Sequence, residues 1–289
     1  MSTISTATTS DVVPLRHHGR TLAAVVVACL TAALLFSIFT NDKVHWDVVG
    51  KAVFSGPILR GASVTILLTT IAMVAGVVLG TLSAIGALST NFVLRAISTV
   101  FTWFFRGTPL VVQILFWFNL ALFFPRIGPW DTNDLISPFT AAALALSLNE
   151  GAYMSEIVRA GIQSVDRGQT EAAQSLGLSP VQTLRRVVLP QAMRIIVPPT
   201  GNETISMLKS TSLVSVIGSV YDLLTRAQIT YRKTGQVIDY LIAVSLWYLF
   251  LTSILTVVQY FIERHFGRGF ARGHSSAARR RFGIGRARA

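Results

Sequence analysis

Apolar stretches of about 20 residues or more constrain this chain more than any other feature of its sequence. They cover about residues 21–40, 61–88, 97–124, 138–162, 194–220 and 238–262. A helix needs about 20 predominantly apolar residues to cross the hydrocarbon core of a bilayer. The sequence therefore predicts an all-α integral membrane protein with about six transmembrane helices.

The charge content supports this prediction. Only 13% of the 289 residues are charged, and 52% are hydrophobic, whereas a typical soluble domain carries about 25% charged residues. The formal net charge is +12, which in a soluble protein would indicate a nucleic-acid partner. Here the basic residues concentrate between Arg159 and Arg194 and after Arg264, with few aromatic residues in the tail. We expect lipid, and not nucleic acid, around this chain.

The distribution of lysine and arginine predicts the orientation. With the N-terminus in the cytoplasm, sixteen of these residues fall in cytoplasmic segments and seven in external ones, while Arg106 and Lys209 lie inside apolar runs. Cytoplasmic segments of membrane proteins carry the excess of basic residues. We therefore expect a multi-pass protein of the cytoplasmic (inner) membrane, with a cytoplasmic tail at 1–20, a first helix at 21–40 and a basic cytoplasmic tail at 267–289.

The first apolar run also raises the alternative of a secretory signal peptide. No small-residue cleavage site follows the run, which ends at Phe39-Thr40-Asn41-Asp42, and such a site is part of a signal peptide. We therefore interpret this run as an uncleaved helix.

Enzymatic and metal-binding residues are not evident. The single cysteine, Cys29, lies in an apolar run, and the five histidines are scattered without ligand spacing. No catalytic constellation is recognisable, and no segment reads GxxxxGK[ST], so the chain lacks a phosphate-cradling loop of its own. We expect a chain that is not an enzyme and holds no cofactor.

Small residues recur in the second apolar run as Gly76, Gly80, Ser83 and Gly86. Such spacing lets two helix backbones approach closely. Two interpretations remain open, namely packing inside the subunit and contact with another subunit.

The polar segment between the fourth and fifth runs predicts a helix, a turn and a second helix. Residues 171–176 favour helix, and Gly177 suits a left-handed helix stop. Ser179 begins a new helix, with Pro180 in its first position and Gln182 completing a capping box. We expect the second helix to run to Leu189 and Pro190 to introduce a bend toward the next span.

This segment carries a recognisable pattern. Glu171-Ala172-Ala173, Gly177, Val187 and Leu189-Pro190 stand at the spacing of the EAA loop, and the segment resembles that loop of binding-protein-dependent ABC importer permeases. The neighbouring segments are similar to the branch of that family that takes up polar amino acids. They are Arg106–Leu110, Leu148–Tyr153, Glu156–Arg159, Gly168-Gln169, Leu189–Ala192 and Lys209–Leu213. The resemblance covers about residues 57–266.

The resemblance implies a function and partners. It implies the permease subunit of an ATP-driven importer for polar amino acids, which receives substrate from an extracytoplasmic solute-binding protein. It also implies a dimer of separate ATP-binding subunits and a second permease subunit, either identical or homologous. The residues that it implies for coupling to the ATPase are Glu171, Ala172, Ala173, Gly177, Leu189 and Pro190.

Polar residues inside the apolar runs predict a substrate path. Glu150 is near the middle of the fourth run, and a carboxylate at that depth should face protein or water. Asn202, Ser206 and Lys209 recur along one face of the fifth helix, which Pro198-Pro199 should bend or break. Our candidates for the path are Asn149, Glu150, Tyr153, Lys209 and Ser212.

The role of the intramembrane charges stays open at this stage. Glu150 and Lys209 are predicted at similar depth, so they either line the path or form a structural ion pair. Arg106 precedes Gly107-Thr108-Pro109, which predicts an interruption of the third helix. The runner-up function is an ion-coupled secondary transporter, which has no use for a cytoplasmic docking helix.

Overall fold

The structure is a computed structural model that describes residues 18–266. The terminal tails predicted at 1–20 and 267–289 therefore lie wholly or almost wholly outside the described residues. The described chain forms two units, one that ends at Trp46 and one that begins at Asp47.

The first unit is dominated by α1 (His18–Phe39). Its apolar side chains, such as Leu22, Leu30 and Phe36, are exposed within this unit. Trp46 stacks on Phe39 with a ring-centroid distance of 4.8 Å, and its Nε1 donates to the Phe39 carbonyl at 3.1 Å. Tryptophan is enriched where a membrane helix meets the headgroup region, so this contact suits the end of a span.

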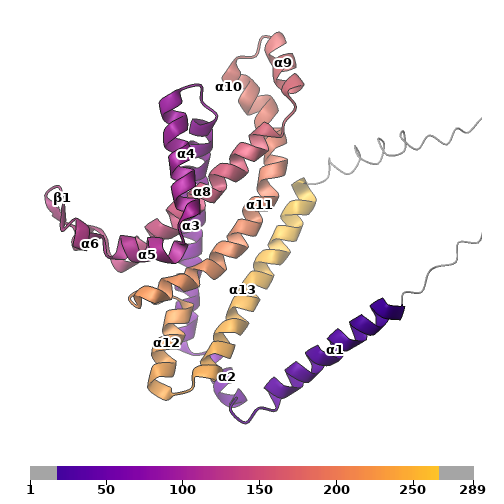
Figure 1. Cartoon of the computed structure of the whole chain (residues 1–289), viewed down its shortest axis with the longest axis vertical. Helices are drawn as coiled ribbons and strands as arrows, with labels where there is room; N and C mark the ends of the chain where they lie inside the picture. The colour runs from indigo at the N-terminus through magenta and orange to yellow at the C-terminus, as the bar shows by residue number, and fades with distance from the viewer. Residues whose placement is uncertain (1–17, 267–289) are drawn as a thin grey trace, which may run out of the picture. The chain divides into compact units, whose positions relative to one another are not determined.

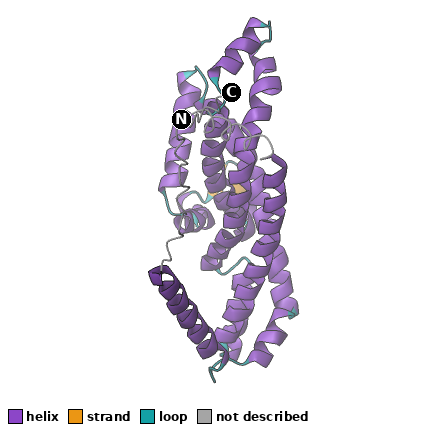
Figure 2. Ribbon diagram, turned by 90° about the vertical axis from the view of Figure 1, so that its right-hand side faces the viewer, coloured by secondary structure: helices purple, strands orange, loops and turns teal. Residues whose placement is uncertain are grey.

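The second unit is almost entirely helical (Figures 1 and 2). Its elements in chain order are α2 (Trp46–Val53), α3 (Gly56–Ala87), α4 (Phe92–Gly107), α5 (Leu110–Phe118), α6 (Leu120–Phe123), β1 (Arg126–Ile127), β2 (Trp130–Asp131), α7 (Thr132–Leu135), α8 (Pro138–Gln163), α9 (Arg167–Ser175), α10 (Pro180–Thr183), the π-helical turn η1 (Leu184–Val188), α11 (Leu189–Ser210), the 3-10 helix η2 (Thr211–Ile217), α12 (Leu223–Thr234) and α13 (Val237–Phe266). The two short strands form an antiparallel hairpin. Within this unit, α9 and α10 lie at one end and α12 lies at the other (Figure 1).

The all-α membrane fold is confirmed. By length and composition, α1, α3 and α13 qualify as membrane spans among the described residues, and the bent pair of α4 and α5 qualifies as a fourth. The helices α8 and α11 have 26 and 22 residues and match two more predicted spans, but polar side chains interrupt their apolar character.

The third predicted span, 97–124, is wrong as one straight helix. The structure ends α4 at Gly107 and starts α5 at Leu110, and the two axes differ by 102°. Thr108 is extended, as expected of a residue before proline, and Pro109 has no N–H to continue the helix. The interruption predicted from Gly107-Thr108-Pro109 is therefore present.

The break considered at Pro198-Pro199 is not present. The helix α11 continues from Leu189 to Ser210 without a break, with both prolines inside it. Prolines are tolerated in membrane helices where a neighbouring helix supports the backbone. Here Gln259 of α13 donates from Nε2 to the Pro198 carbonyl at 2.9 Å, which ties α13 to α11 at this point.

The core of the second unit depends on the close approach of α3 and α8. A Cβ atom on Gly80 would lie 2.4 Å from Met154 Cβ and 2.8 Å from the Gly151 carbonyl oxygen. Ser83 Oγ and Ser155 Oγ are hydrogen-bonded at 2.9 Å along the same contact. The small residues of the second apolar run therefore pack inside the subunit, which resolves the two interpretations of that pattern.

The outer surface of this unit suits contact with lipid. Large apolar side chains on α3, α4 and α13 point outward, among them Val74, Trp103 and Leu249, which are 63%, 73% and 64% exposed. A soluble monomer rarely exposes such a continuous apolar surface.

The glycine contact gives a testable expectation. Replacing Gly80 with alanine should destabilise the protein by about 1–3 kcal/mol, because backbone atoms of α8 occupy the space that the methyl group needs. Thermal unfolding in detergent measures the change. Gly50→Ala is the matched control, because nothing lies within 4 Å of a Cβ atom at Gly50. An unchanged unfolding temperature for Gly80→Ala would contradict the packing described.

Candidate functional site

The segment between α8 and α11 is a preformed helix-turn-helix. The helix α9 ends in a Schellman motif, in which Leu178 N donates to the Ala173 carbonyl at 3.2 Å and Gly177 N donates to the Gln174 carbonyl at 2.9 Å. Gly177 adopts a φ of 82°, which favours glycine because it has no Cβ atom. The predicted helix stop is confirmed.

The second helix of this segment starts as predicted. Ser179 N donates to Gln182 Oε1 at 2.9 Å, and Gln182 N donates to Ser179 Oγ at 3.3 Å, which completes the capping box. Pro180 occupies the first turn. Both helix ends at the turn therefore have local partners, and the turn is held in one conformation.

The bend expected at Pro190 stays a prediction. The chain passes from α10 through the π-helical turn η1 into α11 without a loop, and Pro190 lies in the first turn of α11. Proline cannot donate to the carbonyl four residues earlier, and a π turn is a common way to absorb such a missing bond. The irregularity therefore precedes Pro190.

The residues of the EAA pattern divide into a buried and an exposed set. Ala173 is buried, with 5% exposure, and Glu171, Ala172, Gly177, Leu189 and Pro190 are exposed. Sequence reasoning missed Leu176 and Val181, whose apolar side chains are 84% and 74% exposed on either side of the turn. Their signal was available in the sequence, since each is an apolar residue that stands beside a polar turn.

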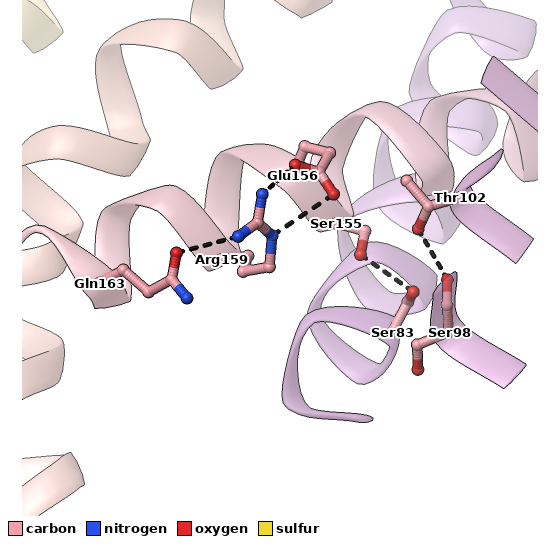
Figure 3. A network of polar contacts seen from close by, with 7 residues as sticks. All are labelled: Ser83, Ser98, Thr102, Ser155, Glu156, Arg159 and Gln163. Atoms are coloured by element: carbon pink, nitrogen blue, oxygen red, sulfur yellow. Dashed lines mark hydrogen bonds and ion pairs between the residues drawn. The ribbon is translucent and has the colours of Figure 1, made fainter. Parts of the chain in front are cut away.

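A second feature is an open pocket of about 650 Å³ between α4 and α8. Its lining includes the basic residues Arg95, Arg106 and Arg159, the acidic residue Glu156, and Tyr153. Arg159 binds Glu156 at 2.5 Å and donates from Nη1 to Gln163 Oε1 at 2.9 Å, so these α8 side chains form one polar network along the pocket wall (Figure 3).

Arg106 is one of the residues that line this pocket. Its guanidinium carbon lies 5.3 Å from the centre of the Tyr153 ring, a distance typical of a cation–π contact. Arg106 is the last arginine of α4 before the interruption at Thr108, so the broken helix presents a cation beside an aromatic ring.

Asn149 does not line this pocket and instead supports the interruption. Its Nδ2 donates to the Phe105 carbonyl at 2.9 Å and lies 3.4 Å from Gln113 Oε1. Gln113 in turn donates to Phe105 and Thr108. These amides supply the donors that the end of α4 lacks after Pro109.

Glu150 is buried between helices, with 2% exposure. Its Oε1 is fully buried and has no hydrogen-bond partner among the described residues. Lys209 is exposed on α11, and within the described part of the chain it makes no ion pair with Glu150. The structural pair considered from the sequence is therefore not formed.

The polar residues of α11 form an exposed stripe. Asn202, Ser206 and Lys209 are all exposed along this helix, as their spacing predicts. Ser212 follows on η2, and its Oγ donates to the Lys209 carbonyl at 2.7 Å. Of the five path candidates, Tyr153 alone lines the α4–α8 pocket, while Lys209 and Ser212 adjoin each other on α11 and η2.

Known proteins resemble this chain over most of its length. The chain is 43% identical over 264 residues to an arginine transport system permease protein of Corynebacterium glutamicum, which covers 90% of this chain and 84% of that protein. It is 39% identical to an L-cystine transport system permease protein of Bacillus subtilis, over 80% of this chain and 95% of that protein. It is 35% identical to a glutamine transport system permease protein of Escherichia coli, over 76% and 96%.

Solved structures of ABC transporters also resemble this chain. The crystal structure of an amino acid ABC transporter with histidines matches with a TM-score of 0.65 and 36% identity, over 72% of this chain and 94% of that one. An inward-facing methionine ABC transporter matches with a TM-score of 0.61 at 17% identity, which supports the fold alone.

The chain also matches a protein-family model. Residues 76–271 match the model described as the binding-protein-dependent transport system inner membrane component. This range contains the helix-turn-helix, the α4–α8 pocket and the α11 stripe. The chain belongs to the binding-protein-dependent transport system inner membrane component family and is a permease subunit of the ABC importer type.

Proposed function

We propose that this chain is the permease of an ATP-driven importer for polar amino acids, which receives substrate from an extracytoplasmic solute-binding protein and is coupled to a separate ATPase. The observation that supports this proposal most strongly is the capped α9–α10 turn, on which the apolar side chains of Leu176 and Val181 are exposed. The relatives described above are named as permeases for arginine, cystine and glutamine. These names support an amino acid as the substrate.

The α9–α10 segment is the proposed docking site for the ATPase. Leu176 and Val181 would enter an apolar groove on that partner, and the exposed Glu171 would meet its polar rim, since apolar anchors inside polar rims carry most binding energy. Because η1 joins α10 to α11 without a loop, a displacement of the turn is passed to α11. Leu189 and Pro190 lie at that junction.

The substrate path is proposed along α11 and the α4–α8 pocket. Polar and charged side chains exposed at mid-membrane depth are costly against lipid, so the stripe that contains Lys209 should face water or protein. A second permease subunit, identical or homologous, would supply the opposite wall. Tyr153 and Glu150 remain in the proposed path, and Asn149 and Ser212 hold the backbone beside it.

The orientation follows the charge distribution. We place both termini, the tails at 1–20 and 267–289, and the α9–α10 segment in the cytoplasm, with α12 outside. An ion-coupled secondary transporter remains the competing function, and it offers no role for the exposed apolar turn.

The first expectation concerns coupling. Gly177→Val should abolish ATP-driven uptake or release the ATPase, because a β-branched residue is strongly disfavoured at positive φ. Uptake and co-purification of the ATPase measure the effect. Gly235→Val is the matched control, because Gly235 also has a positive φ of 76° with open space around it but lies beyond α12. Equal behaviour of the two variants would refute the docking role.

The second expectation concerns the path. Lys209→Met should assemble normally and lower uptake at least about tenfold, because it removes a charge that substrate meets on α11. Lys51→Met on α2 removes an exposed lysine elsewhere and should leave uptake intact. Normal uptake by Lys209→Met at normal expression would remove Lys209 from the path.

The third expectation concerns topology, and the single cysteine makes the test simple. In a Cys29→Ser background, Lys233→Cys should react with a membrane-impermeant maleimide added outside. Val181→Cys should react only after permeabilisation. Labelling of Val181→Cys from outside would contradict the orientation.

A further inference from the structure

The helix α11 has an internal weak point at residues 198–201, Pro-Pro-Thr-Gly, which we call the hinge segment. Neither proline has an N–H, so the carbonyls of Arg194 and Ile195 lose the donors that a regular helix gives them. The helix nevertheless runs through this segment without a break. Because prolines are the usual sites at which a helix bends, the neighbours of the hinge segment decide how far α11 bends here.

The side chain of Gln259 on α13 holds this segment. It is buried, and its Nε2 donates to the Pro198 carbonyl at 2.9 Å and to Glu263 Oε1 at 2.7 Å. An amide nitrogen carries two hydrogens, so both are used. The helix α13 packs along α11 (Figure 1), and this amide therefore joins the α11 backbone to a carboxylate of α13.

The position of the amide depends on Gly201. A Cβ atom at Gly201 would lie 1.4 Å from Gln259 Oε1 and 2.2 Å from Gln259 Cδ. Any side chain at position 201 would therefore displace the amide from its place beside the Pro198 carbonyl. Gly201 provides the space in which the amide lies.

The surroundings of the amide strengthen this contact. Gln259 and Gly201 line a pocket of about 440 Å³ between α3, α8, α11 and α13, and its other lining residues are apolar except for three threonines. Thr81, Thr200 and Thr204 each donate to a carbonyl of their own helix. A hydrogen bond in such apolar surroundings is stronger than one in water. The pocket also leaves room for an amide that has been displaced.

The hinge segment separates two halves of α11 that have different surroundings. In the half before it, a Cβ atom on Gly161 of α8 would lie 2.3 Å from Ile196 Cγ1 and 3.4 Å from the Ala192 carbonyl oxygen, so α8 holds this half closely. This half continues the proposed docking turn through η1. The half after the hinge segment carries Lys209 and leads into η2.

We propose that Gln259 is a positioning residue for coupling, because its amide fixes the hinge segment to α13. A displacement of the α9–α10 turn then moves the Lys209 half of α11 and is not absorbed by bending at Pro198. This inference rests on the proposed function and adds a residue of α13 to the coupling described there. Without the contact, ATP hydrolysis continues but drives less transport.

Two variants remove the contact by independent routes. Gln259→Leu deletes the donors, whereas Gly201→Ala keeps Gln259 and displaces its amide into the pocket. Uptake of radiolabelled arginine, cystine and glutamine and hydrolysis of ATP are recorded together in proteoliposomes that hold the permease–ATPase complex and its solute-binding protein. Each variant should lower uptake per ATP hydrolysed at least about threefold, while the rate of ATP hydrolysis and the folded yield change less than about twofold. A defect in folding alone lowers uptake and hydrolysis together and leaves their ratio unchanged.

A double variant and a control complete the experiment. Gly201→Ala/Gln259→Leu should be no more uncoupled than either single variant, because both exchanges remove the same contact. Thr256→Val is a polar-to-apolar exchange at an exposed position of α13, where the hydroxyl bonds only within its own helix. It should leave uptake per ATP unchanged.

Hydrogen exchange of the permease without its ATPase tests the contact independently of transport. In a regular helix the amides of residues 202–205 bond to the carbonyls of the hinge segment. Their exchange should become at least about threefold faster in both single variants.

Three results would overturn the inference and leave the proposed function intact. They are normal uptake per ATP in both single variants, a double variant whose defect is the product of the two single defects, and unchanged hydrogen exchange. An unchanged complex whose ATPase no amino acid stimulates would contradict the proposed function itself, while faster exchange in the variants would still support the contact.

Discussion

The close contact between α3 and α8 is the constraint on which the rest of the second unit depends. Gly76 and Gly80 remove the side chains that would separate the two backbones, and in lipid such van der Waals contact replaces the hydrophobic effect as the force between helices. This contact fixes α8, and α8 carries both Tyr153 on the pocket side and Glu150 on the buried side. The polar side chains that α8 contributes to the proposed path are therefore positioned by two glycines.

A second consequence of the membrane is that a broken helix needs donors from its neighbours. The interruption after Gly107 would leave carbonyl groups of α4 unpaired, and Gln113 and Asn149 supply those donors. The break turns Arg106 into the end of a helix beside an open pocket. We propose that the capped turn at Gly177 acts as a lever on α11. The proposed docking site is connected to the proposed path through η1 and α11 without an intervening loop.

The sequence predicted the parts of this structure that depend on local rules. The Gly177 stop, the capping box at Ser179 and the small-residue contact of α3 follow from short-range geometry, and each is found. The 102° turn between α4 and α5, the π turn before Pro190 and the intact α11 through Pro198-Pro199 depend on which neighbour supplies a hydrogen bond, and spacing alone does not reveal that. Asn149 and Lys209 illustrate the same limit, because a polar stripe on one helix does not show which member points at a partner.

The central claim is that the α9–α10 turn binds a separate ATPase and transmits the conformational change of that ATPase to the membrane helices. A photo-crosslinking amino acid at position 176, in a complex that hydrolyses ATP, tests it most directly. The account predicts a covalent adduct between this position and the ATPase, and no such adduct from position 221 near α12. An active complex in which position 176 gives no adduct with the ATPase, while position 221 does, would contradict the account.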